Sequence, residues 1–239
     1  MTSGPTSFVE HLRSEGYHPR SNKHSNALAR AIVNDLVTRC DLIRSRAELG
    51  QLSYALNFTL HAGTSDWNVD LVLGPTTRQA APPAPPSNIY EEVPAAIQIA
   101  IEIKSVMTEH HKAVKNRKRD FEAHHEHVAR YDARTISGGV LVVNAAARFQ
   151  SPLRDAPTPH VDTRALTAHC VAQMRGVTER QTADLAGIDA KAVLVVDMDN
   201  IDLASTSYVQ KGEAPGSGDP LHYDAFIYRL CKLYGRRFR

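Results

Sequence analysis

Apolar and polar positions alternate most regularly over residues 97–104. Four isoleucines occupy every second position from 97 to 103, while Glu102 and Lys104 fall on the other parity. Successive side chains of a β-strand point to opposite faces. The pattern therefore predicts a strand with a buried isoleucine face and with Glu102 and Lys104 together on the opposite face.

Two further strands are predicted before this one. Residues 54–61 form the first, and residues 67–73 form the second, in which Asp70 stands between alternating apolar side chains. Residues 63–66 between them are typical of a turn. No helix separates these strands, so we expect an antiparallel meander. Residues 74–94 carry many prolines, which cannot join a ladder or a helix, and are expected to be a loop.

Helical spacing of apolar residues predicts a long helix that starts at Asn22 or Ser25 and ends near Gly50. Two later segments, 138–144 and 191–197, are apolar throughout, as in strands covered on both faces. The helix predicted between them makes these strands parallel. The other expected elements are helices near residues 8–13, over 108–131, over 162–174 and over 220–234.

These elements give an α/β fold with an αβββαβ order and a mixed central sheet flanked by helices. We expect one domain over residues 1–239, with its core at about 22–200 and a basic C-terminal helix at about 220–239.

Composition narrows the class of protein. Hydrophobic residues make up 42% of the 239 residues and charged residues 23%, which is typical of a globular domain. No run of 18 apolar residues predicts a membrane span, and the first ten residues do not resemble a secretory signal. The three cysteines lie far apart, so we expect no disulfide framework and a reduced, cytoplasmic protein.

The candidate chemistry lies on the second and third predicted strands. If these strands are neighbours, Asp70, Glu102 and Lys104 converge at one edge of the sheet. Two carboxylates repel each other unless a cation lies between them, and Mg²⁺ favours one or two carboxylates together with water and phosphate oxygens. Lys104 adds a group that can orient or activate water. A metal, a water and a cation beside a phosphate are the parts of phosphodiester hydrolysis.

Asp70, the Glu102-to-Lys104 sequence EIK and the order of elements resemble the PD-(D/E)XK nuclease superfamily, whose fold is that of restriction endonucleases. The resemblance covers about residues 25–144. It implies that Asp70 and Glu102 ligate Mg²⁺, which Mn²⁺ can replace, and that Lys104 assists the attacking water. Val69 stands where many members have proline, and the proline-rich loop makes the spacing to Glu102 long. Many members carry an acid on the first helix, for which Asp35 and Glu48 are the candidates.

Cations cluster in the helix that follows Lys104. His111 and Lys118 are expected on the face toward the sheet edge, where a lysine reaches the scissile phosphate. Lys115, Arg117 and Arg119 are expected to face outward, toward flanking phosphates, and Lys112 is a further candidate for binding nucleic acid. A second basic run ends the chain: Arg229, Lys232, Arg236, Arg237 and Arg239.

The resemblance is closest in kind to type II restriction endonucleases, which implies a duplex DNA substrate and a homodimer, since cutting both strands needs two sites. A repair nuclease or an RNase has the same chemistry. A non-cutting nucleic-acid-binding module with the same fold is an alternative of another class.

Two other groups of residues are candidates for a metal-binding or catalytic site. His124 and His127 lie one turn apart and could bind zinc, and Asp197 with Asp199 follows a buried strand as in haloacid dehalogenase-like phosphatases. The competing interpretation of these aspartates is that they cap a turn.

Overall fold

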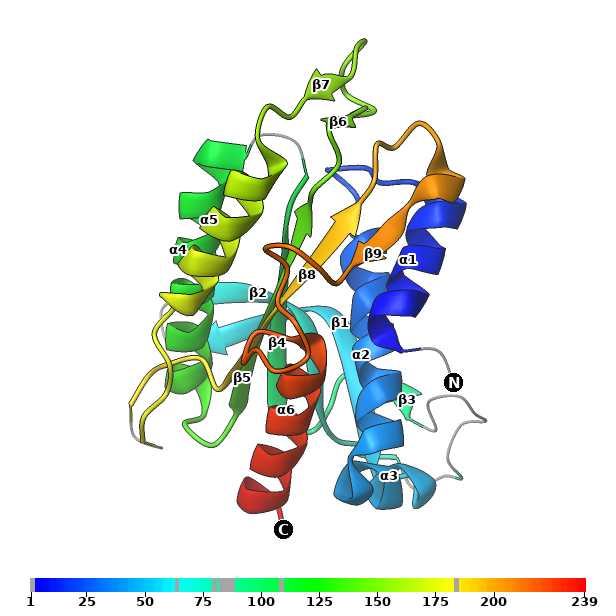
Figure 1. Ribbon diagram of the computed structural model, residues 1–239. Helices are drawn as coiled ribbons and strands as arrows, with labels where there is room; N and C mark the ends of the chain where they lie inside the picture. The colour runs from blue at the N-terminus through cyan, green and yellow to red at the C-terminus, as the bar shows by residue number, and fades with distance from the viewer. Residues whose placement is uncertain (1–2, 63–64, 79–80, 82–88, 108–109, 183–184) are drawn as a thin grey trace.

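The computed structural model describes residues 3–62, 65–78, 81, 89–107, 110–182 and 185–239, with only the backbone described at 62 and 110–112. Within these residues a mixed sheet of seven strands has the order β3-β1-β2-β4-β5-β8-β9. Figure 1 shows helices on both faces of this sheet. The α/β class and the flanked mixed sheet are therefore confirmed.

The first half of the sheet is the expected meander. Strands β1 (Leu52–Ala62), β2 (Ser65–Pro75) and β4 (Ile99–Val106) pair antiparallel in succession. The predicted loop 74–94 is wrong in two parts, because Gly74 and Pro75 still belong to β2 and pair with β1, and β3 (Tyr90–Glu91) pairs parallel with β1. The Tyr54 hydroxyl donates to the Glu91 carboxylate at 2.7 Å and fixes this short strand against β1.

The second half of the sheet is parallel, as predicted. Strands β4, β5 (Ile136–Asn144) and β8 (Ala190–Asp197) run in the same direction, and β9 (Ser207–Val209) closes the edge antiparallel to β8. A small separate hairpin joins β6 (Arg148–Phe149) to β7 (Thr158–Pro159).

Helices α1 (Gly4–Glu15), α2 (Lys23–Arg39), α3 (Asp41–Glu48) and α6 (Tyr223–Arg237) contribute to the buried cluster on one face of the sheet. This cluster contains Ile99, Ile101 and Ile103 of the alternating strand. Helices α4 (His110–Tyr131) and α5 (Thr163–Arg175) cover the other face. A short 3-10 helix, η1 (Leu203–Ser205), precedes β9.

The predicted long helix is interrupted at Cys40. This residue has extended backbone angles (φ −108°, ψ 106°), so α2 ends at Arg39 and α3 begins at Asp41. Apolar spacing continues through the break because both helices bury side chains in the same core. The helix start at Asn22 is confirmed, although the Asn22 side chain makes no capping bond.

Cys40 forms a disulfide with Cys231 of α6, with 5.1 Å between their Cα atoms. The expectation of a fully reduced chain was therefore wrong. The two cysteines lie 191 residues apart, and only the packing of α6 beside the α2–α3 junction brings them together. Cys170 is buried in the other half of the core.

Among the residues described, no helix combines the length and the apolar character needed to cross a membrane.

Candidate active site

Asp70 and Glu102 lie on neighbouring strands at the point where β2 and β4 separate. The last residue pair of their ladder is Leu71 with Ile101. Beyond it, the Asp70 carboxylate accepts a hydrogen bond of 2.7 Å from the backbone N–H of Ile103. The carboxylate thus satisfies a strand donor that β2 no longer pairs, which holds Asp70 beside the end of β4.

Lys104 contacts both carboxylates. Its Nζ makes a close ion pair with Glu102 Oε1 and lies 3.8 Å from Asp70 Oδ2. Period two along β4 places Glu102 and Lys104 on the same side, as the sequence predicted. The structure therefore brings Asp70, Glu102 and Lys104 together, and we call these three residues the candidate active site.

Burial sets the electrostatics of this group. The Glu102 side chain is 1% exposed, and burial raises its pKa to about 8, although the Lys104 ammonium opposes this shift. Burial also raises the pKa of Asp70, against the effects of Lys104 and of the Ile103 N–H. For Lys104, burial alone lowers the pKa, but Glu102 and Asp70 outweigh it and the pKa is raised. Lys104 is thus a stable ammonium group here.

His124 lies directly behind Glu102. Its Nδ1 is 3.8 Å from Glu102 Oε2, and its Nε2 lies 3.3 Å from the backbone oxygen of Ala100. Burial lowers the pKa of His124 to about 3, so the ring is neutral. Neither His124 Nδ1 nor Glu102 Oε2 has a hydrogen-bond partner among the described residues. The contact between His124 and Glu102 was not predicted, because it depends on how α4 packs on β4.

A pocket of about 190 Å³ opens beside Asp70 and Lys104. Its wall comes from the α1–α2 connection, the first turn of α2, the end of β4 and α4. Tyr17 Oη and Ser105 Oγ lie 2.5 Å apart in this wall, and Ser25 lines it too, with its hydroxyl donating to the Asn22 oxygen at 3.2 Å. Sequence reasoning considered Ser25 only as a helix cap and did not single out Tyr17 or Ser105.

The cations of α4 are placed differently from the prediction. Arg117, expected to face outward, lines the pocket and pairs with Asp120 at 3.0 Å. Lys118, expected to face the site, lies with its Nζ close to Gly176 at the end of α5. Lys115 and Arg119 are exposed, as predicted. The side chains of His111 and Lys112 lie outside the described residues.

The two accessory acids are elsewhere. Asp35 is buried and accepts a hydrogen bond of 2.9 Å from the Gly4 backbone N–H, and its carboxylate also contacts Tyr223 of α6. Glu48 is exposed at the last residue of α3. Neither carboxylate joins the candidate active site. From α2, the polar side chain of Ser25 lines the pocket beside it.

The donor set fits a hard divalent cation with few protein ligands. Mg²⁺ typically keeps several waters and takes one or two carboxylates from the protein. Asp70 and Glu102 provide two, and the unpartnered buried Oε2 of Glu102 is an oxygen that still needs a partner. No group of three or more His, Cys, Asp or Glu side chains suited to a metal occurs within the described part of the chain. A metal here would rest on these two carboxylates, water and substrate oxygens.

The geometry does not favour the zinc site at His124 and His127 or the phosphatase-like site at Asp197 and Asp199. His124 faces Ala100 and Glu102, whereas His127 stacks on Trp67 with ring centres 5.0 Å apart, so the two rings turn to different neighbours. Asp199 accepts hydrogen bonds from the backbone N–H groups of residues 201 and 202 at 2.8 and 2.9 Å, which is the turn-capping role.

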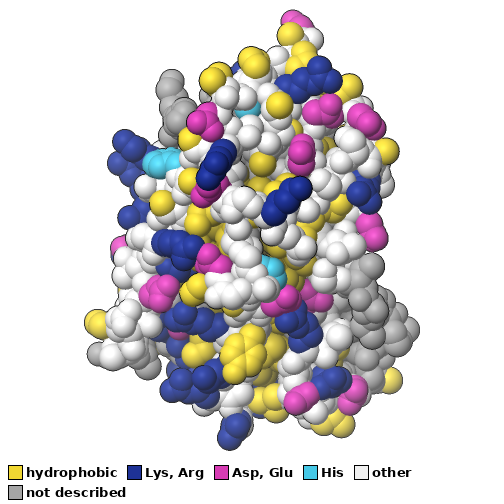
Figure 2. Space-filling model, viewed as in Figure 1, with side chains coloured by type: hydrophobic (Ala, Val, Ile, Leu, Met, Phe, Trp, Pro, Cys, Tyr) yellow, Lys and Arg dark blue, Asp and Glu magenta, His cyan; other side chains and the backbone are white. Residues whose placement is uncertain are grey.

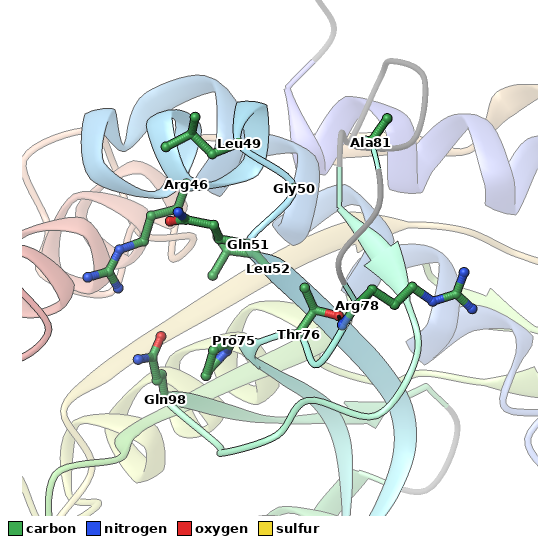
Figure 3. A pocket seen from close by; sticks show the side chains of 10 residues that line it. All are labelled: Arg46, Leu49, Gly50, Gln51, Leu52, Pro75, Thr76, Arg78, Ala81 and Gln98. Atoms are coloured by element: carbon green, nitrogen blue, oxygen red, sulfur yellow. Dashed lines mark hydrogen bonds between the residues drawn. The ribbon is translucent and has the colours of Figure 1, made fainter.

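Figure 3 shows a larger hollow of about 750 Å³ at the opposite end of β4, between the end of α3 and the start of β1. Four of its polar side chains, those of Arg46, Thr76, Arg78 and Gln98, have partners. Arg46 donates to Tyr234 Oη at 3.0 Å, the same hydroxyl donates to Gln98 at 2.7 Å, and Arg78 pairs with Glu92. This hollow therefore adds no reactive group to the candidate active site.

Comparison of the chain with family models, with curated proteins and with solved structures found no match.

Proposed function

We propose that this protein is a Mg²⁺-dependent DNA endonuclease of the PD-(D/E)XK type. One observation carries the proposal: Asp70, Glu102 and Lys104 come from two diverging strands and meet in one group, of which Asp70 and Lys104 line a pocket. The EIK pattern alone is short, but its convergence with an aspartate of the adjacent strand is a geometric requirement that a chance match does not meet.

In this proposal Asp70 and Glu102 hold Mg²⁺ or Mn²⁺. The metal would neutralise phosphate charge and polarise a bound water. Lys104, a stable ammonium beside both carboxylates, orients the attacking water and stabilises negative charge on the phosphate. Arg117 lines the same pocket and is the side chain of α4 best placed to contact a phosphate near the scissile bond.

The proposed partner is duplex DNA, cut in a restriction or defence role by a homodimer in the cytoplasm. Exposed Lys115 and Arg119 of α4 would meet flanking phosphates, which fix position without reading sequence. The Cys40–Cys231 disulfide is the observation that weighs against a reducing compartment.

The test is cleavage of supercoiled plasmid with Mg²⁺ or Mn²⁺, using the wild type beside Lys104→Ala. The matched control is Lys211→Ala, an exposed lysine far along the chain from the site. We expect discrete fragments from the wild type and the control and a loss of at least about 100-fold in Lys104→Ala. If the wild type degrades the plasmid to a smear of fragments and Lys104→Ala does not, the catalytic residues are supported but the restriction role is contradicted. Cleavage that survives Lys104→Ala would show that the site is wrong.

A repair nuclease or an RNase is distinguished from a restriction endonuclease by its preferred substrate. The same assay with methylated duplex, branched DNA, single strands and RNA identifies the preferred one. Preference for branched DNA or RNA over intact duplex would replace the restriction role and leave the catalytic residues unchanged.

The second candidate is a nucleic-acid-binding module that does not cut. It is favoured by the position of Lys104, whose ammonium already compensates both carboxylates without a metal. Calorimetric titration with Mn²⁺ distinguishes the two. A nuclease should show a site that Asp70→Asn abolishes, whereas a pure binding module should show none.

A further inference from the structure

The exposed face of α6 is cationic and carries one aromatic side chain. Phe226, Ile227, Leu230 and Tyr234 bury the opposite face of this helix in the core. The outward residues are Tyr228, Arg229, Lys232 and Arg236. Tyr228, Lys232 and Arg236 are spaced by four, so they form one row that rises by about 6 Å per step. Figure 2 shows Lys and Arg side chains gathered around α6 in the lower part of the view.

This row borders a pocket of about 660 Å³ between α6 and the segment that leads into β8. Five cations line the pocket among the described residues, against a single carboxylate, that of Asp189. That carboxylate is committed, because it accepts two hydrogen bonds from Arg237, at 2.6 and 3.0 Å, and one from the Ser137 N–H at 2.9 Å. The pocket therefore presents excess positive charge toward solvent.

Arg180 lies in the wall of this pocket and is incompletely satisfied. Its side chain is 2% exposed, its Nη1 donates to the Ala133 oxygen at 2.6 Å and its Nε donates to the Gly187 oxygen at 3.3 Å. Its Nη2 has no hydrogen-bond partner within the described part of the chain. A buried guanidinium with an unused donor is costly unless an acceptor completes it. The charge of Arg180 is balanced by Asp189, whose Oδ2 lies 3.5 Å from Arg180 Nε.

The exposed ring of Tyr228 indicates which class of anionic ligand the pocket would bind. Its side chain is 66% exposed on the same row as Lys232 and Arg236. A cationic groove with an exposed aromatic ring is the arrangement that binds single-stranded nucleic acid, because unpaired bases stack on the ring while phosphates lie along the cations. In a duplex the bases are already stacked on each other and offer no face to such a ring.

We propose that the α6 face is a single-stranded DNA binding site, with a base stacked on Tyr228 and phosphates bound by Lys232 and Arg236. The site goes beyond the proposed nuclease function and is separate from the candidate active site. It lies on the isoleucine face at the amino end of β8, whereas Lys104 lies near the carboxyl end of β4.

The experiment measures fluorescence anisotropy of a labelled oligothymidylate of about 15 nucleotides, in EDTA, over a range of salt concentrations. Tyr228→Ala should weaken binding by about tenfold and leave the salt dependence unchanged, because it removes stacking only. The double variant Lys232→Ala with Arg236→Ala should lower the slope of log K against log salt by about 1.4, for two lost phosphate contacts.

Matched controls use exposed side chains elsewhere. Tyr131→Ala and the pair Arg164→Ala with Lys211→Ala remove an exposed tyrosine and two exposed cations from other surfaces. These variants should bind as the wild type does. All substitutions are at exposed positions, so the fold is kept.

The proposal is overturned if Tyr228→Ala binds as tightly as the wild type, or if the double variant keeps the full salt slope. It is also overturned if a duplex of the same length binds equally well and loses affinity equally in Tyr228→Ala. The two proposals fail in different ways. A protein that binds oligothymidylate through α6 but never cuts DNA would contradict the nuclease proposal and support the α6 site. A protein that cuts DNA, and whose α6 variants bind oligothymidylate as the wild type does, would contradict only the α6 site.

Discussion

The Asp70 carboxylate accepts a hydrogen bond from the backbone N–H of Ile103 at the place where β2 and β4 stop pairing. One side chain thus has two tasks. It completes the hydrogen bonding of a diverging strand, and it places a negative charge 3.8 Å from the Lys104 ammonium. These tasks require different properties of the side chain, an acceptor oxygen for the first and a charge for the second.

The two tasks can be separated by two substitutions. Asp70→Asn keeps an acceptor for Ile103 but removes the charge, whereas Asp70→Ala removes both. We expect both to reduce plasmid cleavage by at least about 100-fold. Only Asp70→Ala should lower the free energy of unfolding, by about 1–3 kcal/mol, because it leaves the Ile103 N–H unpaired. Urea denaturation measures stability. Full cleavage by Asp70→Asn would contradict the metal-ligand role, and equal destabilisation by both would contradict the structural role.

Glu102→Gln should stabilise the fold while it abolishes cleavage. Burial raises the pKa of Glu102 from its ordinary value of 4.5 to about 8, so the folded state favours the protonated, neutral form. The wild type therefore loses stability as pH rises from about 4.5 to 8, and glutamine, which does not ionise, removes this loss. In metal-free buffer at pH 8 the variant should be more stable by about 1–4 kcal/mol. Parallel stability curves for the two proteins from pH 5 to 9 would refute the inferred burial cost.

The fold was predictable because the buried pattern repeats with the period of each element. Ile99, Ile101 and Ile103 at period two identified β4, and the apolar runs of β5 and β8 marked strands covered on both faces. The fourth isoleucine was placed wrongly, because Ile97 precedes β4 and belongs to another buried cluster, with Ala100 and Val128. Glu102 and Lys104 followed from the same parity. Asp70 required in addition that β2 lie beside β4, which the structure shows although residues 76–98 form a long connection between the two strands.

The rest of the site depends on tertiary packing that periodicity does not encode. Val114 and Phe121 identify the buried stripe of α4, but Arg117 and Lys118 flank it on either side. Only the positions of α2 and α5 decide that Arg117 meets the pocket and Lys118 meets Gly176. Tyr17 reaches Ser105 across 88 residues for the same reason.

The disulfide between Cys40 and Cys231 is expected to contribute directly to stability. It closes a separation of 191 residues, and removing a native disulfide typically costs about 2–4 kcal/mol. Reduction of the wild type should lower the midpoint of urea denaturation, whereas the double variant Cys40→Ser with Cys231→Ser should be insensitive to reductant. Thiol titration of unreduced, denatured protein should find one free thiol, that of Cys170. Three free thiols in freshly purified protein would contradict the pairing.

His24 should make the fold sensitive to acid. The ring lines the pocket beside the candidate active site, stacks on Tyr17 with ring centres 4.6 Å apart and accepts a hydrogen bond of 2.8 Å from the His18 N–H. Burial is the main cause that lowers the pKa of His24 to about 4, and the neighbouring His11 lowers it further. The unfolded chain binds a proton near pH 6.5, while the folded chain resists it until about pH 4. Stability is therefore complete above pH 6.5 and is lost as pH falls toward 4.

A glutamine at this position tests the assignment, because it keeps an acceptor but does not titrate. Between pH 7 and 4 the wild type should lose roughly 1–2 kcal/mol more than His24→Gln, the full linkage being reduced by solvent screening at the edge of the pocket. His61→Gln is the control, since its side chain is 75% exposed. Urea denaturation at four or more pH values measures the difference. If His24→Gln and His61→Gln show the same pH dependence as the wild type, the acid sensitivity of the fold arises from other groups.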